Sequence, residues 1–145
     1  MRNLPVVYIE RELLIRACGS SHYTVAYIPS KAYLLSKTET YLENGSVKKS
    51  YEVDYMGYEG VNEYLEEIGF MMGEGYSAPK ARVYNDFDTC KEMTQKMNDE
   101  LFTRRISSLD EADSIRKARE YDAIKKLIAS LEERYLLEDN QNENE

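Results

Sequence analysis

The chain has 145 residues and a formal charge of −8, and its length fits a single domain that can bury a core without disulfides. Its acidity argues against sequence-independent binding to nucleic acid, which rests on many contacts from lysine and arginine to phosphate. No run approaches the ~18 apolar residues that a membrane-spanning helix needs. Cys18, Cys90 and the single histidine, His22, lack the spacing of a zinc site. These features predict a reduced, cytoplasmic protein with no metal, no cofactor and no membrane contact.

The first third of the chain reads as two strands. From Pro5 to Ala17 most odd positions are apolar while Glu10, Glu12 and Arg16 fall on even ones, which is the period of a strand, broken by Arg11. A helix from Glu10 to Cys18 is the competing interpretation, because glutamate, arginine and leucine also favour helices. We favour the strand. A second strand is predicted over His22–Ile28, and Pro29-Ser30-Lys31 is predicted to turn the chain.

The stretch from Ala32 to Met56 is predicted to form one long β-hairpin closed by Asn44-Gly45. Asn-Gly favours a two-residue type I′ turn, because both central residues of that turn need positive φ. With a two-residue loop, one face of the hairpin is apolar and aromatic. On the other face Lys37 lies directly opposite Glu52, a charge pair that would help to fix the register.

The next segments are predicted to be a helix and a short edge strand. Apolar residues recur at helical spacing from Val61 to Met71 or Met72, with Gly69 loosening the last turn. The run Lys80–Asn85 is predicted to be a short strand that could join the sheet edge.

A second helix is predicted to start at the capping box Thr89-x-x-Glu92. Its apolar stripe is Cys90, Met93, Met97 and Leu101. Because Cys90 belongs to this stripe, we expect a buried, inert thiol instead of one activated by the helix N-terminus.

A long C-terminal helix is predicted from the capping box Ser108-x-x-Glu111 to Leu137. Its apolar residues between Tyr121 and Tyr135 follow a heptad rhythm over two heptads. We favour packing of this seam on its own domain, and a dimer seam is the alternative. Residues 138–145 contain no apolar residue and are predicted to form a disordered acidic tail.

Together these elements predict an α+β fold in a single domain, residues 1–137. The expected architecture is an antiparallel β-meander of three to five strands, covered on one face by two or three helices and ending in a long C-terminal helix.

No catalytic constellation emerges from the sequence. Ser20 and Ser21 precede His22 without a Gly-x-Ser-x-Gly elbow, and neighbouring acids on helices diverge. We therefore expect a non-catalytic protein-interaction module, a monomer or weak homodimer, that binds a protein partner with a basic surface and makes no direct contact with nucleic acid. The expected partner-binding residues combine tyrosines and acids of the hairpin and the corner after it: Glu39, Tyr41, Glu52, Tyr55, Tyr58 and Glu59.

An alternative is a small-molecule module that sequesters an anionic or nucleotide ligand. Arg104 and Arg105 end one predicted helix and Ser108 begins the next, so guanidinium groups would lie near free backbone N–H groups. Arg116 and Arg119 could extend this site if the two helices pack as a hairpin.

The layout of the chain is that of an acidic, tyrosine-rich α+β protein with thirteen tyrosines and a polar tail. It resembles many small accessory proteins of bacteriophages and mobile elements, including inhibitors of host systems. The resemblance covers architecture only, and it implies that binding inhibits a host component.

Overall fold

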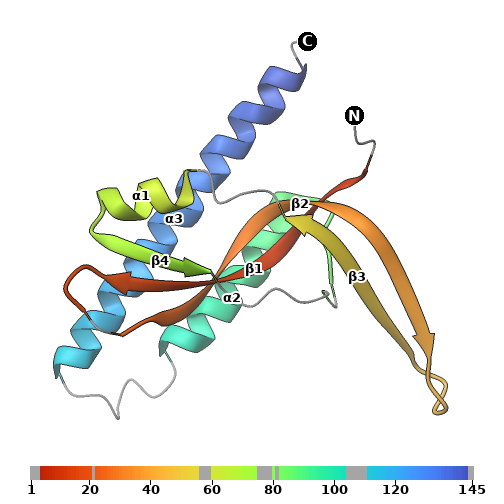
Figure 1. Ribbon diagram of the computed structural model, residues 1–145, viewed down its shortest axis with the longest axis horizontal. Coiled ribbons are helices and arrows are strands. Elements are labelled where there is room, and N and C mark those ends of the chain that lie inside the picture. The colour runs from red at the N-terminus through yellow and green to blue at the C-terminus, as the bar shows by residue number, and fades with distance from the viewer. Residues whose placement is uncertain are drawn as a thin grey trace.

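The fold is given by a computed structural model (Figure 1), which describes residues 4–20, 22–55, 60–74, 80, 82–103 and 111–143. Within these residues one antiparallel sheet has the strand order β3-β2-β1-β4 and is accompanied by three helices, as the predicted α+β class requires. The elements are β1 (Val6–Ala17), β2 (Thr24–Tyr41), β3 (Val47–Tyr55), α1 (Val61–Glu67), β4 (Phe70–Glu74), α2 (Phe87–Thr103) and α3 (Glu111–Glu143).

The first predicted strand is confirmed as β1, and the competing helix is absent from this described segment. β1 pairs with β2 from Val6 opposite Tyr33 to Ile15 opposite Thr24. Leu13 and Ile15 are fully buried on the face that the alternating pattern assigned to the core.

The turn predicted at Pro29-Ser30-Lys31 is wrong, because β2 runs through it without a break. Proline is tolerated in a strand where its missing N–H would face outward from the ladder. Here Tyr27 and Lys31 turn their backbone N–H groups away from β1, to Asn98 Oδ1 at 2.9 Å and to the Tyr135 hydroxyl at 3.4 Å. Pro29 lies midway between these two residues and faces the same way. Its missing N–H therefore removes no hydrogen bond between β2 and β1.

The helix predicted to reach Met72 is also wrong in its second half. α1 ends at Glu67, and Gly69 has a φ of 87°, a left-handed conformation that commonly stops a helix. The chain then reverses into β4, whose Phe70 pairs with Ala17 of β1. β4 therefore becomes the fourth strand, at the edge beside β1.

The edge strand predicted over Lys80–Asn85 is present only as two isolated bridges. Tyr84 exchanges backbone hydrogen bonds with Tyr8, and Lys80 does so with Tyr51 of β3. The segment therefore touches two different strands.

The predicted second helix exists as α2, but its cap and its buried stripe differ from the prediction. Asp86, one residue before α2, accepts hydrogen bonds from the backbone and hydroxyl of Thr89 at 2.8 Å, so it acts as the N-cap in place of Thr89. These two hydrogen bonds lower the pKa of Asp86. The buried stripe is Cys90, Thr94, Asn98 and Phe102, so two polar residues replace the expected methionines.

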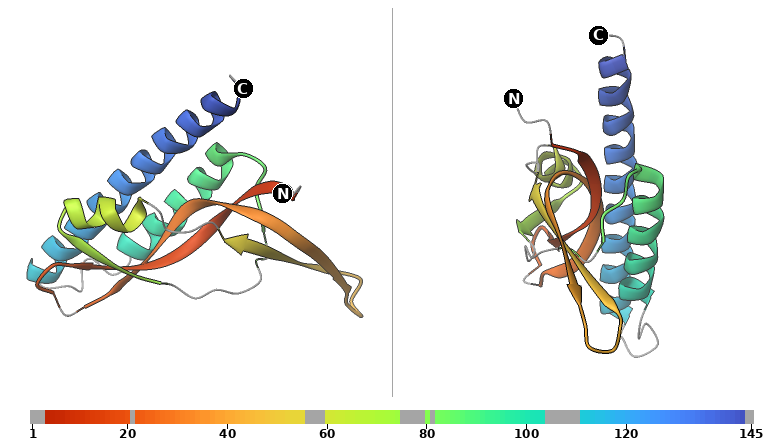
Figure 2. Two further views of the ribbon diagram at one scale, coloured as in Figure 1. Left: turned by 45° about the horizontal axis from the view of Figure 1, so that its top comes forward. Right: turned by 90° about the vertical axis from the view of Figure 1, so that its right-hand side faces the viewer.

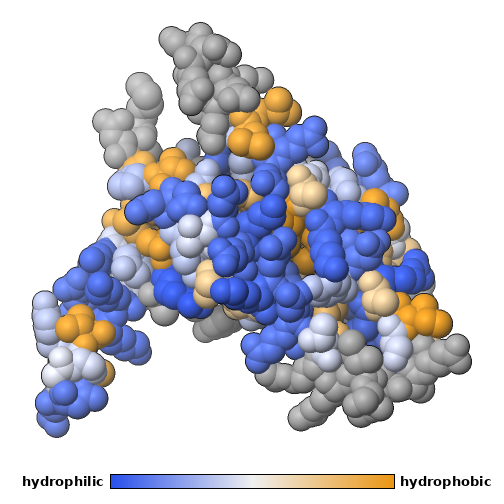
Figure 3. Space-filling model, turned by 180° about the vertical axis from the view of Figure 1, so that it is seen from behind, coloured by the Kyte–Doolittle hydropathy of each residue, from blue (hydrophilic) through white to orange (hydrophobic). Residues whose placement is uncertain are grey.

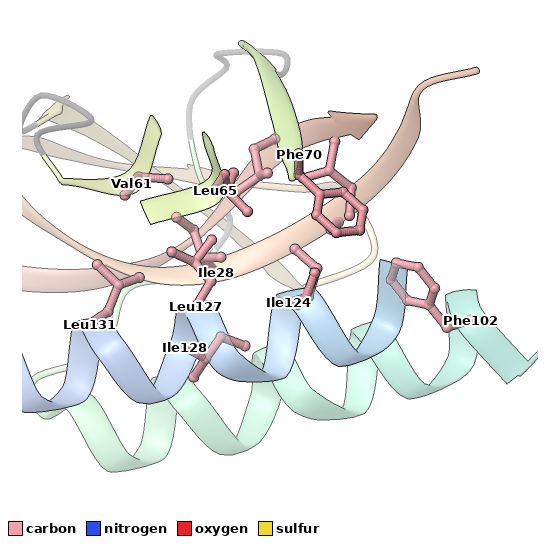
Figure 4. Packing of buried hydrophobic residues seen from close by; sticks show 13 residues of the cluster. Ile28, Val61, Leu65, Phe70, Phe102, Ile124, Leu127, Ile128 and Leu131 are labelled. Atoms are coloured by element: carbon pink, nitrogen blue, oxygen red, sulfur yellow. The ribbon is translucent and has the colours of Figure 1, made fainter. Parts of the chain in front are cut away.

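The core lies between the sheet, α1 and α3 (Figure 4). Ile124, Ile128 and Leu131 of α3 are almost fully buried there, so the heptad seam packs on its own domain as we favoured. α2 and α3 lie side by side on one face of the sheet, as Figure 2 shows. α3 continues to Glu143, past its predicted end at Leu137, while the disorder predicted for residues 138–145 stays a prediction.

Candidate functional site

Beyond Leu34, strands β2 and β3 leave the body of the protein as a two-stranded ribbon, which we call the arm (Leu35–Glu52). Every residue from Leu35 to Lys49 is exposed, on both faces of the ribbon. Figures 1 and 3 show the arm standing clear of the helices, and its hydrophilic surface is interrupted by hydrophobic residues. No other pair of described strands projects in this way.

The base of the arm is held by a small apolar cluster separate from the main core. Val7, Ile9 and Ala32 are buried there, and half-buried Leu34 and Val53 pack against them. A β-bulge follows at once, because the pairing register of β2 with β3 shifts between Leu34 and Ser36. A bulge increases local twist and bends the strand that carries it, which accounts for the change of direction where the arm begins.

The turn at the tip has a three-residue loop, and this overturns the predicted register. The Leu42 N–H donates to the Ser46 carbonyl at 2.9 Å, and the Gly45 N–H donates to the Leu42 carbonyl at 3.0 Å. Gly45 has a φ of 84°, so the loop combines a type I turn with a glycine bulge. Tyr41 consequently lies opposite Val47, one residue away from the predicted pairing.

The predicted charge pair between Lys37 and Glu52 is therefore wrong. Lys37 lies opposite Tyr51, and Glu52 lies opposite Ser36, whose hydroxyl donates to the Glu52 carboxylate at 3.3 Å. Because a one-residue shift moves side chains to the opposite face, Glu39 and Glu52 now point to different sides of the arm.

One face of the arm carries a short polar chain of interactions. The Lys37 ammonium lies 3.2 Å from Glu39, and the Tyr41 hydroxyl donates to the same carboxylate at 3.2 Å. The hydrogen bond from Lys37, followed by that from Tyr41, lowers the pKa of Glu39. Tyr51, Lys49 and Val47 complete this face from β3.

Large apolar side chains on the arm are unusually accessible. Tyr41 is 74% exposed, and Leu35, Leu42 and Val47 are each exposed by more than two fifths. Exposed apolar residues scattered singly are ordinary, but Tyr41 and Val47 are directly opposite each other and share one face. They form a small apolar patch near the tip, beside the ionised Glu39.

Among the predicted partner-binding residues, the structure thus brings together only Glu39 and Tyr41. Tyr55 lies opposite Ala32 in the ladder of β2 and β3, and its side chain is not among the parts that the structure describes. Tyr58 and Glu59 lie outside the described residues, so the predicted corner stays a prediction.

The alternative ligand site also falls outside the described residues, since Arg104, Arg105 and Ser108 are not among them. Of its possible extensions, Arg116 lies 3.6 Å from both Asp113 and Glu120. These acids already surround its guanidinium group.

A shallow hollow of about 550 Å³ lies between α1 and α3, and its rim includes Glu63, Glu67 and Arg134. Arg134 closes over the start of α1, because a Cβ atom added to Gly60 would lie 2.2 Å from its Nη1 atom. In the part of the chain that is described, no three His, Cys, Asp or Glu side chains gather as a metal site would need. No helix of that part has the length and hydropathy needed to cross a bilayer.

The thiol of Cys90 is fully buried, which confirms the prediction made from its position on the stripe. Burial, and then the nearby charges of Glu10 and Asp86, raise its pKa to about 12. Since the thiolate is the reactive form, Cys90 is an inert core residue.

Two features of the arm escaped the sequence reasoning. The first is the bulge after Leu34. Apolar and polar residues do not alternate regularly at that point of the sequence, so the pattern could not reveal an extra residue there. The second is the unpaired backbone edge of β2. It was missed because the turn predicted at Pro29-Ser30-Lys31 divided this one long strand into two. The signal that could have revealed it is the continuity of β-forming residues on both sides of that proline.

When the chain is compared with family models, with curated proteins and with solved structures, none of the three comparisons gives a match.

Proposed function

We propose that this protein is a non-catalytic interaction module that binds a protein partner through the arm. The observation that carries the proposal is that every residue from Leu35 to Lys49 is exposed, on a ribbon that adds nothing to the core. Ordering such a ribbon costs conformational entropy that no burial within this chain offsets, whereas burial against a partner would.

The face with Tyr41 and Val47 is the part of the arm best suited to a partner. Tyrosine is enriched at the centres of interfaces, where its ring is buried and its hydroxyl is paired. Here the Tyr41 hydroxyl is already directed at Glu39, which favours one orientation of the ring. A partner that offers an apolar pocket for Tyr41 and a basic group for Glu39 would match this face.

The finer form of the proposal follows the architectural resemblance to accessory proteins of bacteriophages and mobile elements. In this form the partner is a cytoplasmic component of a host system, and binding inhibits it. The same face would then block a functional surface of that component.

Site-specific photocrosslinking in source cells tests the proposal. A photoreactive phenylalanine analogue at position 41 should give a crosslinked protein adduct, while the same analogue at position 96, on exposed Lys96 of α2, should not. Adding Val47→Lys on the same face should abolish the adduct from position 41. Lys48→Ala, on the opposite face of the arm, should leave the adduct unchanged.

Adducts from position 96 but not from position 41 would contradict the choice of surface. No adduct from either position, in cells where the protein is folded, would contradict the interaction itself. Inhibition is tested separately, by adding the purified protein or its Val47→Lys variant to the captured partner.

A further inference from the structure

The outer edge of β2 along the arm is a row of unpaired backbone groups. In an antiparallel pair, alternate residues direct their N–H and C=O groups toward the neighbouring strand and away from it. Tyr51 directs both of its groups outward, to Lys80 at 2.8 and 2.9 Å. Its direct partner Lys37 therefore points outward on the β2 side, and so do Glu39 and Tyr41. Within the described residues none of these three has a backbone partner on that side.

This edge lacks most of the devices that keep sheet edges from pairing. Such devices include short strands, prolines, bulges and charged side chains along the edge, and from Ser36 to Tyr41 only the charged side chains of Lys37 and Glu39 are present. The bulge of β2 lies at the base, between Leu34 and Ser36, and the pairing from Ser36 to Tyr41 is regular and free of proline. In Figure 1 β2 forms the outer side of the arm, away from the helices. No described residue pairs with this edge from Ser36 to Tyr41, so it is open to a further strand.

The side chains of this edge are complementary to those of a second copy of the same strand that runs antiparallel and is centred on Thr38. An antiparallel copy centred there puts Lys37 opposite the partner's Glu39, and symmetry repeats that charge pair. It puts Thr38 opposite itself, a favourable cross-strand pair, and Leu35 opposite the partner's Tyr41.

We propose that two copies of this chain pair through the β2 edges of their arms, about a two-fold axis at Thr38. The two arms then form a four-stranded antiparallel ribbon. Lys37 and Glu39 of each copy become narrow hydrogen-bonded pairs, because their backbone groups are the ones that point outward. Isologous pairing of this kind uses one patch twice, as a C2 dimer requires.

Neighbouring registers are disfavoured by charge and by the turn. A two-fold axis at Lys37 or at Glu39 would place identical charges directly opposite each other. An axis at Thr40 would set Lys37 against Glu43, which lies in the three-residue loop and cannot extend a ladder. The axis at Thr38 keeps every pair from Leu35 to Tyr41 within β2.

This inference goes beyond the proposed function, because it concerns the backbone edge and a second copy of the same chain. Pairing at the edge leaves the faces of the ribbon free. It would place the Glu39 and Tyr41 faces of two copies side by side, and so offer a foreign partner two equivalent contacts.

Charge reversal tests the register. Lys37→Glu alone and Glu39→Lys alone each place like charges opposite each other, so each should weaken self-association about tenfold at low salt. An equimolar mixture of the two variants restores both charge pairs, and the heterodimer should form with about the affinity of the unaltered protein. Sedimentation velocity over a concentration series measures these constants. A mixture that associates no better than either variant would overturn the register.

Proline substitution tests the edge. Glu39→Pro removes an outward N–H of β2 without touching a bond to β3, whereas Lys49→Pro does the same on the β3 edge at the directly opposite position. Glu39→Pro should abolish dimers and Lys49→Pro should keep them, with circular dichroism showing that both remain folded. Equal effects of the two prolines, or a protein that stays monomeric at all concentrations, would overturn the proposal. Glu39→Pro also removes the carboxylate of the proposed partner face, so the proposed function is tested by crosslinking from position 41 in the chain with its natural Glu39 and not in this variant.

Discussion

The side-chain amide of Asn98 pairs with both backbone groups of Tyr27. The Tyr27 N–H donates to Asn98 Oδ1 at 2.9 Å, and Asn98 Nδ2 donates to the Tyr27 carbonyl at 2.8 Å. An amide side chain has the same donor and acceptor as a peptide group, so Asn98 occupies the place of a neighbouring strand where β3 does not yet cover β2. Asn98 is 3% exposed, and water cannot easily replace it.

Replacing Asn98 should therefore be costly for stability. Asn98→Leu leaves the N–H and the C=O of Tyr27 without partners in the core, and we expect the free energy of unfolding to fall by about 3 kcal/mol. Urea denaturation followed by circular dichroism measures this change. The matched control is Asn62→Leu on an exposed position of α1, which should shift stability by less than about 0.5 kcal/mol. Similar losses for both variants would show that the pairing is not the cause.

The heptad seam of α3 gives a second prediction. Leu131 is 4% exposed within the core, so Leu131→Glu should bury an unpaired charge and unfold the monomer. Leu137 is 57% exposed on the same helix, so Leu137→Glu should leave the fold intact. Light scattering coupled to size exclusion, with circular dichroism on the same samples, separates the outcomes. A folded monomer of Leu131→Glu derived from a wild-type dimer would instead identify the seam as intermolecular.

The turn at the tip of the arm should be sensitive to substitution of Gly45. Gly45 has a left-handed φ, and no atom lies within 4 Å of the Cβ that alanine would add, so Gly45→Ala meets backbone strain without a clash. We expect it to cost about 1 kcal/mol, confined to the arm. Hydrogen exchange at the Leu42 amide should speed up while the melting temperature of the body stays constant. Gly45→Asn should have a smaller effect, because asparagine tolerates this conformation.

Glu120 is a buried acid that its surroundings compensate poorly. It is 1% exposed, its carboxylate oxygens accept no hydrogen bond from the described residues, and its cationic partner among them is Arg116 at 3.6 Å. The Arg116 side chain is 31% exposed and also lies 3.6 Å from Asp113, so it keeps an acidic partner when Glu120 is removed, although its Nε atom is buried. Glu120→Met should therefore raise the free energy of unfolding by about 1 kcal/mol, whereas Glu133→Met at an exposed position should not. A loss of several kcal/mol would mean that the ion pair with Arg116 is strongly stabilising.

The buried thiol predicts a dependence of stability on alkaline pH. The pKa of Cys90 rises from 9.0 to about 12 on folding, so the unfolded chain loses this proton first as the pH increases. The stabilisation that the neutral thiol provides is complete below pH 9.0 and is lost between pH 9.0 and about 12. Denaturation of wild type and Cys90→Ala over this range should show a shallower decline for the variant. Parallel slopes would rule out a contribution from Cys90.

Sequence patterns predicted the elements whose structure is local or strongly periodic. The alternation before Ala17 gave β1, and the heptad rhythm of α3 gave its buried side. Both follow from side-chain direction in regular backbone, which a sequence records directly.

The failures share a different physical origin. Pro29 fits inside β2 because its missing N–H faces away from β1, and Asn98 is buried where it pairs with the backbone of Tyr27, a part of β2 that β3 does not cover. Those facts depend on tertiary contacts between distant segments. The register of the arm failed for a local reason, since Asn44-Gly45 fits both a two-residue and a three-residue loop. The predicted site followed that register, which is why Glu52 was assigned to the face of Glu39.

The uninterrupted course of β2 has a mechanical consequence. One strand, Thr24–Tyr41, belongs both to the body and to the arm, so a force applied by anything bound near Tyr41 is transmitted along its length. Such a force pulls β2 lengthwise past β1, and the hydrogen bonds from Val6 to Ile15 are loaded together in shear. Bonds loaded together resist far better than bonds that open one at a time, as in a zipper. We therefore expect the attachment of the arm to the body, through the β1–β2 ladder, to resist tension applied by a bound partner.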